Sequence, residues 1–362
     1  MKKEHWTYRL GGLLLWGVAV LLVACSDASD GIEGETDMLQ LVTYTRGMED
    51  FSPSTTRAVT LPGGYREYTG PNSIGVYTTT ANEAPDEVRS FTYMNGSWNS
   101  MVSVINDYSY YIYGYMPVNN NIRCAITKRP EKDYSEGAVL RFTNLPPVMA
   151  EDFSIVTGVL QLPSPNPEGD FELKAGNFYY SGKPNGSNFV CLMLDHLYSC
   201  VRFQFFVDKT YNQLRTIKLK QVRMKTTEDI YYPLVVTMKK EEDYEVNWGT
   251  QGELTNNFAT LFTSTAGEIL HVKPEDSQEP EPVLVEGYFA PKDNVAGSLV
   301  LECTYDVYDK QGNMTRENCV AINKLPALGA GANQRTLLTL TVKPTYLYVL
   351  SEPDLDNPTI TN

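Results

Sequence analysis

The sequence predicts an all-β protein built from two β-sandwich domains, and three observations predict its β class and domain number. Its 24 tyrosines, 21 prolines and 26 glycines favour strands and turns. Short β-branched or aromatic runs follow one another from Ile74 onward with turn residues between them, which is typical of a sandwich or barrel. At 362 residues the chain exceeds the roughly 250 residues that a single core usually reaches, so two domains are expected.

Residues 1–24 are expected to be a lipoprotein signal peptide. Lys2, Lys3 and Arg9 give a positive start, and residues 10–23 form an apolar stretch too short to span a bilayer, which needs about twenty residues. The segment ends in Leu-Val-Ala-Cys25, which resembles the lipobox at which bacterial lipoproteins are acylated. Cys25 is therefore the expected lipidation site, the alternative being an ordinary signal peptide with an incidental cysteine.

The next segment, residues 25–57, is expected to be a lipidated tether and pro-segment that carries the first strand. Residues 26–37 are polar and acidic, and a β-favouring run follows from Met38 to Tyr44. Arg46 ends this strand, and a stretch rich in Gly, Ser, Pro and Thr leads to Arg57. The first strand is thus separated from the rest of the chain by a loop-forming segment.

Strand patterns continue through both expected domains. In two runs, 201–207 and 299–307, every second residue is apolar, which indicates one core face and one face toward water. Glu302, Thr304 and Asp306 fall on the water side. Residues 309–313 supply a hairpin turn, and helices should be few and short because helical spacing is never sustained. A Gly/Pro/Asn-rich stretch at 182–188 divides the domains, giving 58–186 and 187–343, with a tail of 344–362.

Composition and motifs argue against nucleic-acid binding and give no sign of catalysis. The net charge of −14 repels phosphate backbones. No hydrolase, phosphate-binding or dinucleotide motif occurs, and neither a cofactor nor a metal is expected. His196 is expected to pack at the start of a core strand, although it could share a metal with Cys200. The five remaining cysteines are interpreted as small buried residues, with disulfides 191–200 or 303–319 as the alternative.

Several runs together resemble the fimbrillin family, the pilus subunits of Bacteroides-type bacteria. They are the lipobox at Cys25, Thr-Thr-Arg57-Ala58, Ile74-Gly75-Val76-Tyr77, Tyr113-Gly114-Tyr115-Met116-Pro117, Leu194-Asp195-His196-Leu197 leading into Val201-Arg202-Phe203, and residues 325–340. The resemblance implies two transthyretin-like Greek-key β-sandwich domains, an acylated precursor on the outer membrane and assembly into surface fimbriae. It also implies cleavage after an arginine that removes the first strand, for which Arg57 and Arg46 are the candidates.

Strand exchange needs a donor strand, and the C-terminal tail offers one. Pro344 ends the preceding strand, and a further apolar run follows: Tyr346, Leu347, Tyr348, Val349 and Leu350. This run could fill an open sheet edge in a neighbouring subunit, or fold back on its own domain. The implied partners are other pilin subunits, the membrane through the lipid, and a ligand on a host or bacterial surface.

A different class of function is a surface glycan-binding lipoprotein. Its argument is a cluster of aromatic residues that could stack on sugar rings: Tyr108, Tyr110, Tyr111, Tyr113 and Tyr115. Alternate residues of a strand point to opposite faces, so core packing is the competing interpretation of the cluster.

Overall fold

The structure of the protein is a computed structural model. It describes residues 36–46, 48, 65–67, 73–83, 89–94, 97–99, 102–119, 122–164, 174–183, 188–227, 232–249, 258–274, 281–329 and 331–343. The predicted lipidation site Cys25, the predicted cleavage site Arg57 and the predicted donor run 346–350 lie outside these residues.

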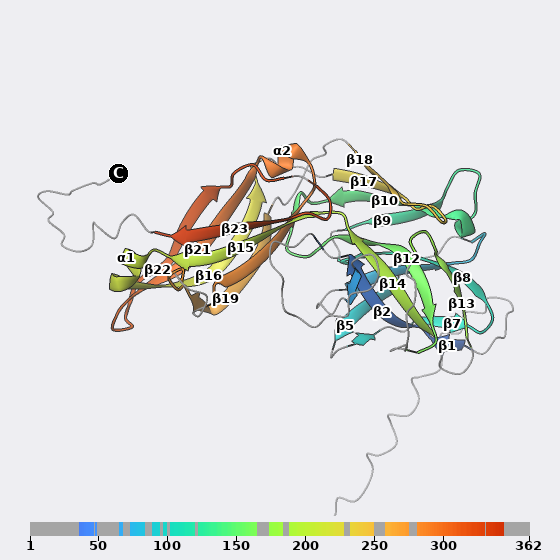
Figure 1. Cartoon of the computed structure of the whole chain (residues 1–362), viewed down its shortest axis with the longest axis horizontal. Coiled ribbons are helices and arrows are strands. Elements are labelled where there is room, and N and C mark those ends of the chain that lie inside the picture. Colours follow the sequence, from blue (N-terminus) through green and yellow to red (C-terminus); the bar gives the residue numbers. More distant parts are fainter. Residues whose placement is uncertain are drawn as a thin grey trace, which may run out of the picture. The chain divides into compact units, whose positions relative to one another are not determined.

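The described chain is almost entirely β, as predicted, and its strands form four main sheets (Figure 1). The first sheet has nine strands: β3 (Tyr65–Glu67), β2 (Gln40–Arg46), β14 (Phe189–His196), β12 (Ser154–Leu162), β8 (Ser109–Met116), β4 (Ser73–Thr79), β5 (Arg89–Met94) and β6 (Ser97–Asn99) in order, with β13 (Tyr179–Ser181) beside β8. The second consists of β18 (Glu245–Trp248), β17 (Tyr232–Thr237), β10 (Ala138–Leu145) and β9 (Cys124–Lys128).

Two further sheets lie mainly in the second half of the chain. The third is β11 (Val148–Met149), β20 (Val283–Phe289), β15 (Ser199–Val207) and β23 (Arg335–Val342). The fourth is β19 (Phe258–Ile269), β16 (Arg215–Thr226), β21 (Leu299–Asp309) and β22 (Met314–Lys324). A small pair joins β1 (Thr36–Met38) to β7 (Ser103–Ile105). The described helices are the short α1 (Lys209–Leu214), α2 (Asp293–Ala296) and the 3-10 turn η1 (Tyr134–Glu136).

The sheets pack through alternating apolar residues. The predicted core face of β15 is buried throughout, at Val201, Phe203, Phe205 and Val207. These side chains belong to a large cluster to which all four main sheets contribute. A second cluster covers the opposite face of the first sheet, including Ile74, Val76, Ile112 and Met116. The central strands of the first sheet, β12 and β14, are therefore buried on both faces, which is why they are rich in apolar residues on both sides.

Several strand pairings cross the boundary predicted near residues 182–188. The hairpin β17–β18 joins β10 in the second sheet, and β14 pairs with β12 and β2 in the first. Only Leu197 and Tyr198 separate β14 from β15, which pairs in the third sheet. The division into two transthyretin-like domains stays a prediction, and strands from both sides of the predicted boundary pair within the same sheets.

Asp306 is buried although the alternation places it on the water side of β21. It is 3% exposed, while Tyr305 and Val307 both stay in the core cluster. The ladder between β21 and β22 shifts register here because β22 carries one extra residue. Asn318, in a left-handed backbone conformation at this bulge, donates its N–H to the Asp306 carboxylate at 2.7 Å. Lys220 Nζ lies 3.4 Å from the same carboxylate, so the buried acid has two partners.

None of the five described cysteines forms a disulfide, so the disulfide alternative is wrong. Cys191 and Cys200 lie on strands of different sheets, and Cys303 pairs across the ladder with Ala321 rather than Cys319. Burial raises the pKa of Cys124, Cys191, Cys200 and Cys303 to about 12, which leaves these four as unreactive thiols at neutral pH.

Candidate functional site

The first long strand, β2, is inserted beside β14 as a parallel neighbour (Figure 1). The parallel ladder runs from the pair Gln40 and Phe189 to the pair Thr45 and Leu194. On its other side β2 meets the short strand β3, from Tyr44 to Arg46. A strand that comes from the start of the chain is thus held mainly by one neighbour from the middle of the chain.

Side chains on both faces of the segment 39–46 are buried. Leu39 and Leu41 enter the second cluster, while Tyr44 packs with Leu162, Cys191 and Met193 in a separate third cluster. Thr43 is 1% exposed, and its hydroxyl accepts a hydrogen bond from Trp98 Nε1 at 3.0 Å. We call the space filled by residues 39–46 beside β14 the β2 slot. It is lined by apolar side chains and by the backbone of β14.

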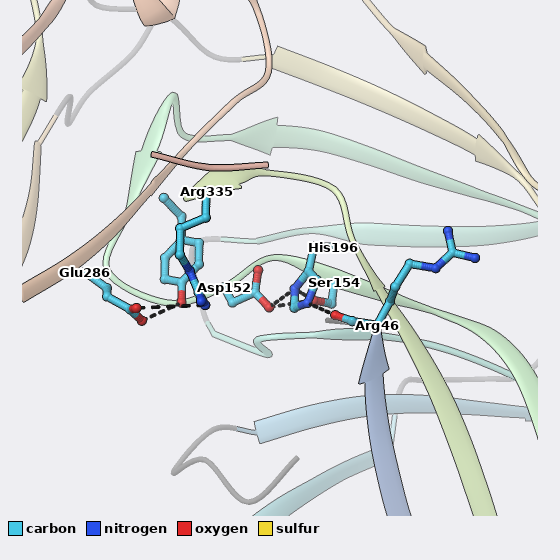
Figure 2. Close-up of polar contacts among 7 residues, drawn as sticks. Arg46, Asp152, Ser154, His196, Glu286 and Arg335 are labelled. Atoms are coloured by element: carbon cyan, nitrogen blue, oxygen red, sulfur yellow. Dashed lines mark hydrogen bonds and ion pairs between the residues drawn. The ribbon is translucent and has the colours of Figure 1, made fainter. Parts of the chain in front are cut away.

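Three polar side chains gather at the C-terminal end of this slot, and we call Asp152, Ser154 and His196 the polar clamp (Figure 2). His196 Nε2 lies 2.7 Å from the carbonyl oxygen of Arg46, the last residue of β2. Its Nδ1 contacts the Asp152 carboxylate and lies 3.2 Å from Ser154 Oγ. Ser154 Oγ donates to Asp152 Oδ2 at 2.8 Å, so the carboxylate and the imidazole are each fixed by two partners.

The positions of the clamp residues follow from the ladder between β12 and β14. Ser154 begins β12 and His196 ends β14, and the two are directly paired across the ladder. Asp152 lies two residues before β12, and all three side chains are buried. The sheet therefore brings the clamp together without any residue of β2.

Both ring nitrogens of His196 face acceptors, one a carboxylate and the other a backbone carbonyl. Such an arrangement is best met by an imidazolium with a proton on each nitrogen. Burial alone would lower the pKa of His196, but the charge of Asp152 and hydrogen bonds to Asp152 and to the Arg46 carbonyl raise it above its ordinary value of 6.5. The positive ring also faces Asp195.

The side chain of Arg46 points away from the clamp (Figure 2). Its Nη1 lies 3.5 Å from Asp195 Oδ2, and the side chain is 47% exposed. The contact of Arg46 with the clamp is thus made through its backbone, and the side chain is held at the surface.

Beyond Asp152 lies a second charged group, formed by Glu286 and Arg335 of the third sheet (Figure 2). Glu286 accepts from Arg202 Nε at 2.6 Å and lies 3.9 Å from Arg335 Nη2. Asp152 Oδ1 is buried and has no hydrogen-bond partner within the described part of the chain. The clamp is therefore a buried polar cluster that reaches β2 through the bond between His196 and the Arg46 carbonyl.

Sequence reasoning placed Arg46 at the end of the first strand, where the structure has it, but missed the clamp. His196 is buried as expected, but it ends β14 instead of beginning a core strand, and its partners were not foreseen. Asp152 stands alone before a strand and carries no motif, so only the folded sheet brings it to His196. Tyr113 and Tyr115 lie in the large core cluster, which leaves them unable to stack on a sugar.

Metal binding and membrane crossing are two further possibilities for the described residues. No group of three or more His, Cys, Asp or Glu side chains is placed to hold a metal among them. Within the same part of the chain, no helix has the length and apolar character needed to cross a bilayer.

Comparison with known proteins gives matches among solved structures. No family model and no curated protein matches the chain. The structural neighbours include a fimbrial protein from Bacteroides vulgatus, with 12% identity, a TM-score of 0.36, and coverage of 75% of this chain and 89% of the other. A candidate cell adhesion protein from Bacteroides fragilis has 11% identity, a TM-score of 0.38, and coverage of 85% and 94%.

A third neighbour is the fimbrial anchor protein Mfa2 from Porphyromonas gingivalis, with 10% identity, a TM-score of 0.24, and coverage of 87% of this chain and 93% of that one. The neighbours named here are thus fimbrial and cell adhesion proteins. Because these TM-scores are below 0.5, the proposals below are carried by the residues of this chain.

Proposed function

We propose that this protein is a subunit of cell-surface fimbriae, exported as a lipoprotein acylated at Cys25 and assembled by strand exchange after its first strand is removed. The observation that carries the proposal is the β2 slot, in which a strand from the start of the chain fills an apolar position beside β14. No catalytic step is assigned to it.

Loss of β2 would leave a surface that favours association. Removal of β2 would expose the apolar neighbours of Leu39, Leu41 and Tyr44, and one edge of β14 would lose its parallel hydrogen-bond partner. Burial of each such side chain is worth about 1.5–3 kcal/mol, and unpaired strand edges bind fitting strands. A strand supplied by another subunit would restore both contributions by β-augmentation.

The proposed donor is the run Tyr346 to Leu350 of a second copy or of a related subunit. β23 ends at Val342, as part of a parallel ladder with β15, and Pro344 cannot donate to a continued ladder. The five-residue apolar run that follows is then available to another molecule. If it instead folds back on its own domain, subunits would remain separate.

Assembly into ladders on a denaturing gel tests this proposal. Full-length protein treated with an arginine-specific protease should form a ladder of oligomers in unheated samples, and deletion of residues 345–362 should abolish it. In a matched control, the cleaved deletion variant is mixed with a second chain that has residues 345–362 but has not been cleaved. The second chain can donate its tail but keeps its own β2 slot filled, so this mixture should form dimers and no longer ladder. A ladder that persists without residues 345–362 would contradict the proposed donor.

Membrane attachment is tested separately. Cys25→Ser should abolish labelling by a fatty-acid analogue in cells and release the chain from the outer membrane, because two or more acyl chains are needed for stable anchoring. Labelling that survives the substitution would contradict Cys25 as the acylated residue.

A further inference from the structure

The backbone ladder of β14 cannot reach the last residue of β2, and a side chain takes its place. The N–H of Leu197, just beyond β14, donates to Phe153 O at 2.8 Å. The chain then turns into β15. The Arg46 carbonyl is bound instead by His196 Nε2 at 2.7 Å. The end of the β2 slot is therefore closed by a hydrogen-bond donor that belongs to neither ladder.

This donor is prearranged for a carbonyl. Asp152 and Ser154 hold the other side of the imidazole, and His196 is only 8% exposed. None of these residues is part of β2, so the donor would stay in place when β2 leaves. A buried N–H that loses its acceptor destabilises the protein, and it does so more strongly when the donor is charged. The empty slot would thus favour an occupant that restores the acceptor.

We infer that His196 is a positioning residue of the β2 slot: it binds a backbone carbonyl of whichever strand fills the slot and so fixes the register of that strand. This inference rests on the proposed strand exchange. The occupant it fits is an extended segment parallel to β14, with apolar side chains at the positions of Leu41 and Tyr44. The carbonyl of the residue at the position of Arg46 meets the clamp.

The size of the slot selects one register for the proposed donor from a second copy. Thr43 is 1% exposed, so a larger side chain would not fit at its position without moving its neighbours. Val349 is the residue of the donor run closest in size to threonine, and with Val349 there the bond from Trp98 Nε1 to the Thr43 hydroxyl would be lost. Placing Val349 there puts Leu347 at the position of Leu41 and Leu350 at that of Tyr44, and the carbonyl of Glu352 then meets His196. A shift by one residue would force the larger Tyr348 or Leu350 into the Thr43 position.

The inference is tested on the full chain with a site-specific protease sequence placed within residues 50–56. After cleavage, the rate at which the N-terminal fragment leaves is measured by its exchange with a labelled peptide of residues 36–46. The measurement is repeated at several denaturant concentrations, so that the release rate of a tightly held strand can also be determined. His196→Ala should release the fragment at least about tenfold faster. His196→Gln retains an N–H donor and should recover most of the loss, and His271→Ala, an exposed histidine, should change nothing.

A peptide series isolates the carbonyl itself. The longer peptide is an amide of residues 36–46 with Arg46→Ala, which keeps the carbonyl of residue 46 but removes the guanidinium. The shorter peptide is an amide of residues 36–45 and lacks that carbonyl. The shorter peptide should bind cleaved wild-type protein about tenfold more weakly than the longer one. The two should bind His196→Ala equally well.

Two results would overturn the inference: release from His196→Ala at the wild-type rate, or an equal penalty for the shorter peptide in both proteins. Neither depends on the C-terminal tail. The proposed assembly is tested by the gel ladders, which depend on residues 345–362, and the positioning role is tested by release of the fragment and binding of the peptides. Failure of the positioning role and failure of the proposed assembly therefore give different outcomes.

Discussion

His196 makes retention of the first strand depend on pH. Its pKa is raised above 6.5 because the folded state holds a positive ring between Asp152 and the Arg46 carbonyl. The other charged groups around the ring are Asp195 and the Arg46 guanidinium, with Glu286 and Arg335 beyond Asp152. Asp152 stays beside the ring when β2 leaves, so only the part of the rise that comes from the bond to the Arg46 carbonyl stabilises the bound strand. This stabilisation is present while the ring is protonated and is lost as the pH rises through the pKa of His196 with β2 in place.

We therefore expect the cleaved N-terminal fragment to leave more slowly at about pH 5.5–6.5 than at higher pH, with the change centred on the pKa of His196. The release rate against pH, together with an NMR titration of the His196 ring, measures this dependence. His196→Gln should give a flat profile over the same range. A ring pKa at or below 6.5, or the same pH dependence in His196→Gln, would contradict the charged clamp.

Gly114 allows two strands of the first sheet to approach closely. It pairs with Val76 across β4 and β8, and a Cβ at this position would lie 2.4 Å from the Gly75 carbonyl oxygen and 3.0 Å from Val156 Cγ2. Gly114→Ala should lower the free energy of unfolding by about 1–3 kcal/mol, since backbone must move to admit the methyl group.

Chemical denaturation measures this loss, and Gly329→Ala is a matched control, because the added Cβ there meets only Gln334 Oε1 at 3.4 Å. The control should stay within about 0.5 kcal/mol of wild type. Equal stability of Gly114→Ala and wild type would show that the sheet can separate at this point without cost.

The strand β2 protects one candidate cleavage site at the level of secondary structure. Arg46 pairs with β3 at Tyr65, and its carbonyl is bound by His196. A protease needs several residues in an extended, unpaired form, which this arrangement denies it. Arg57 lies in a sequence rich in Ser, Thr and Pro, so we expect it to be the residue that is cut.

Limited proteolysis of the folded chain with an arginine-specific protease should yield a new N-terminus at Ala58. Arg57→Ala should remove that product, and Arg46→Ala should leave it unchanged. Mass spectrometry of the fragments decides between the two sites. A product of the folded protein that begins at Gly47 would contradict protection by the ladder and the clamp.

The sequence predicts where the strands lie in the chain better than it predicts which strands pair with each other. Alternation identified β15 and β21 because one face of each is core, and the hairpin after Asp309 followed from its turn residues. The pattern of one strand does not say which strand lies beside it. The parallel pairing of β2 with β14 and the place of the hairpin β17–β18 in the second sheet therefore came only from the structure.

Across the whole molecule, the candidate site joins parts of the chain that are far apart in sequence. Arg46 and His196 are separated by 150 positions, and Asp152 comes from a third place in the chain. Periodicity could locate the first strand and the arginine at its end, because these depend on neighbouring residues. It could not find the clamp, since a single buried acid and a single buried histidine acquire their roles only when the first sheet forms.

The proposed assembly depends on removal of the first strand and its replacement by a strand from another subunit. N-terminal sequencing of the protein recovered from surface fibres tests this most directly. We predict that assembled copies begin at Ala58, with no residue of β2 present. Assembled copies that all begin at an acylated Cys25 and retain β2 in its slot would contradict it.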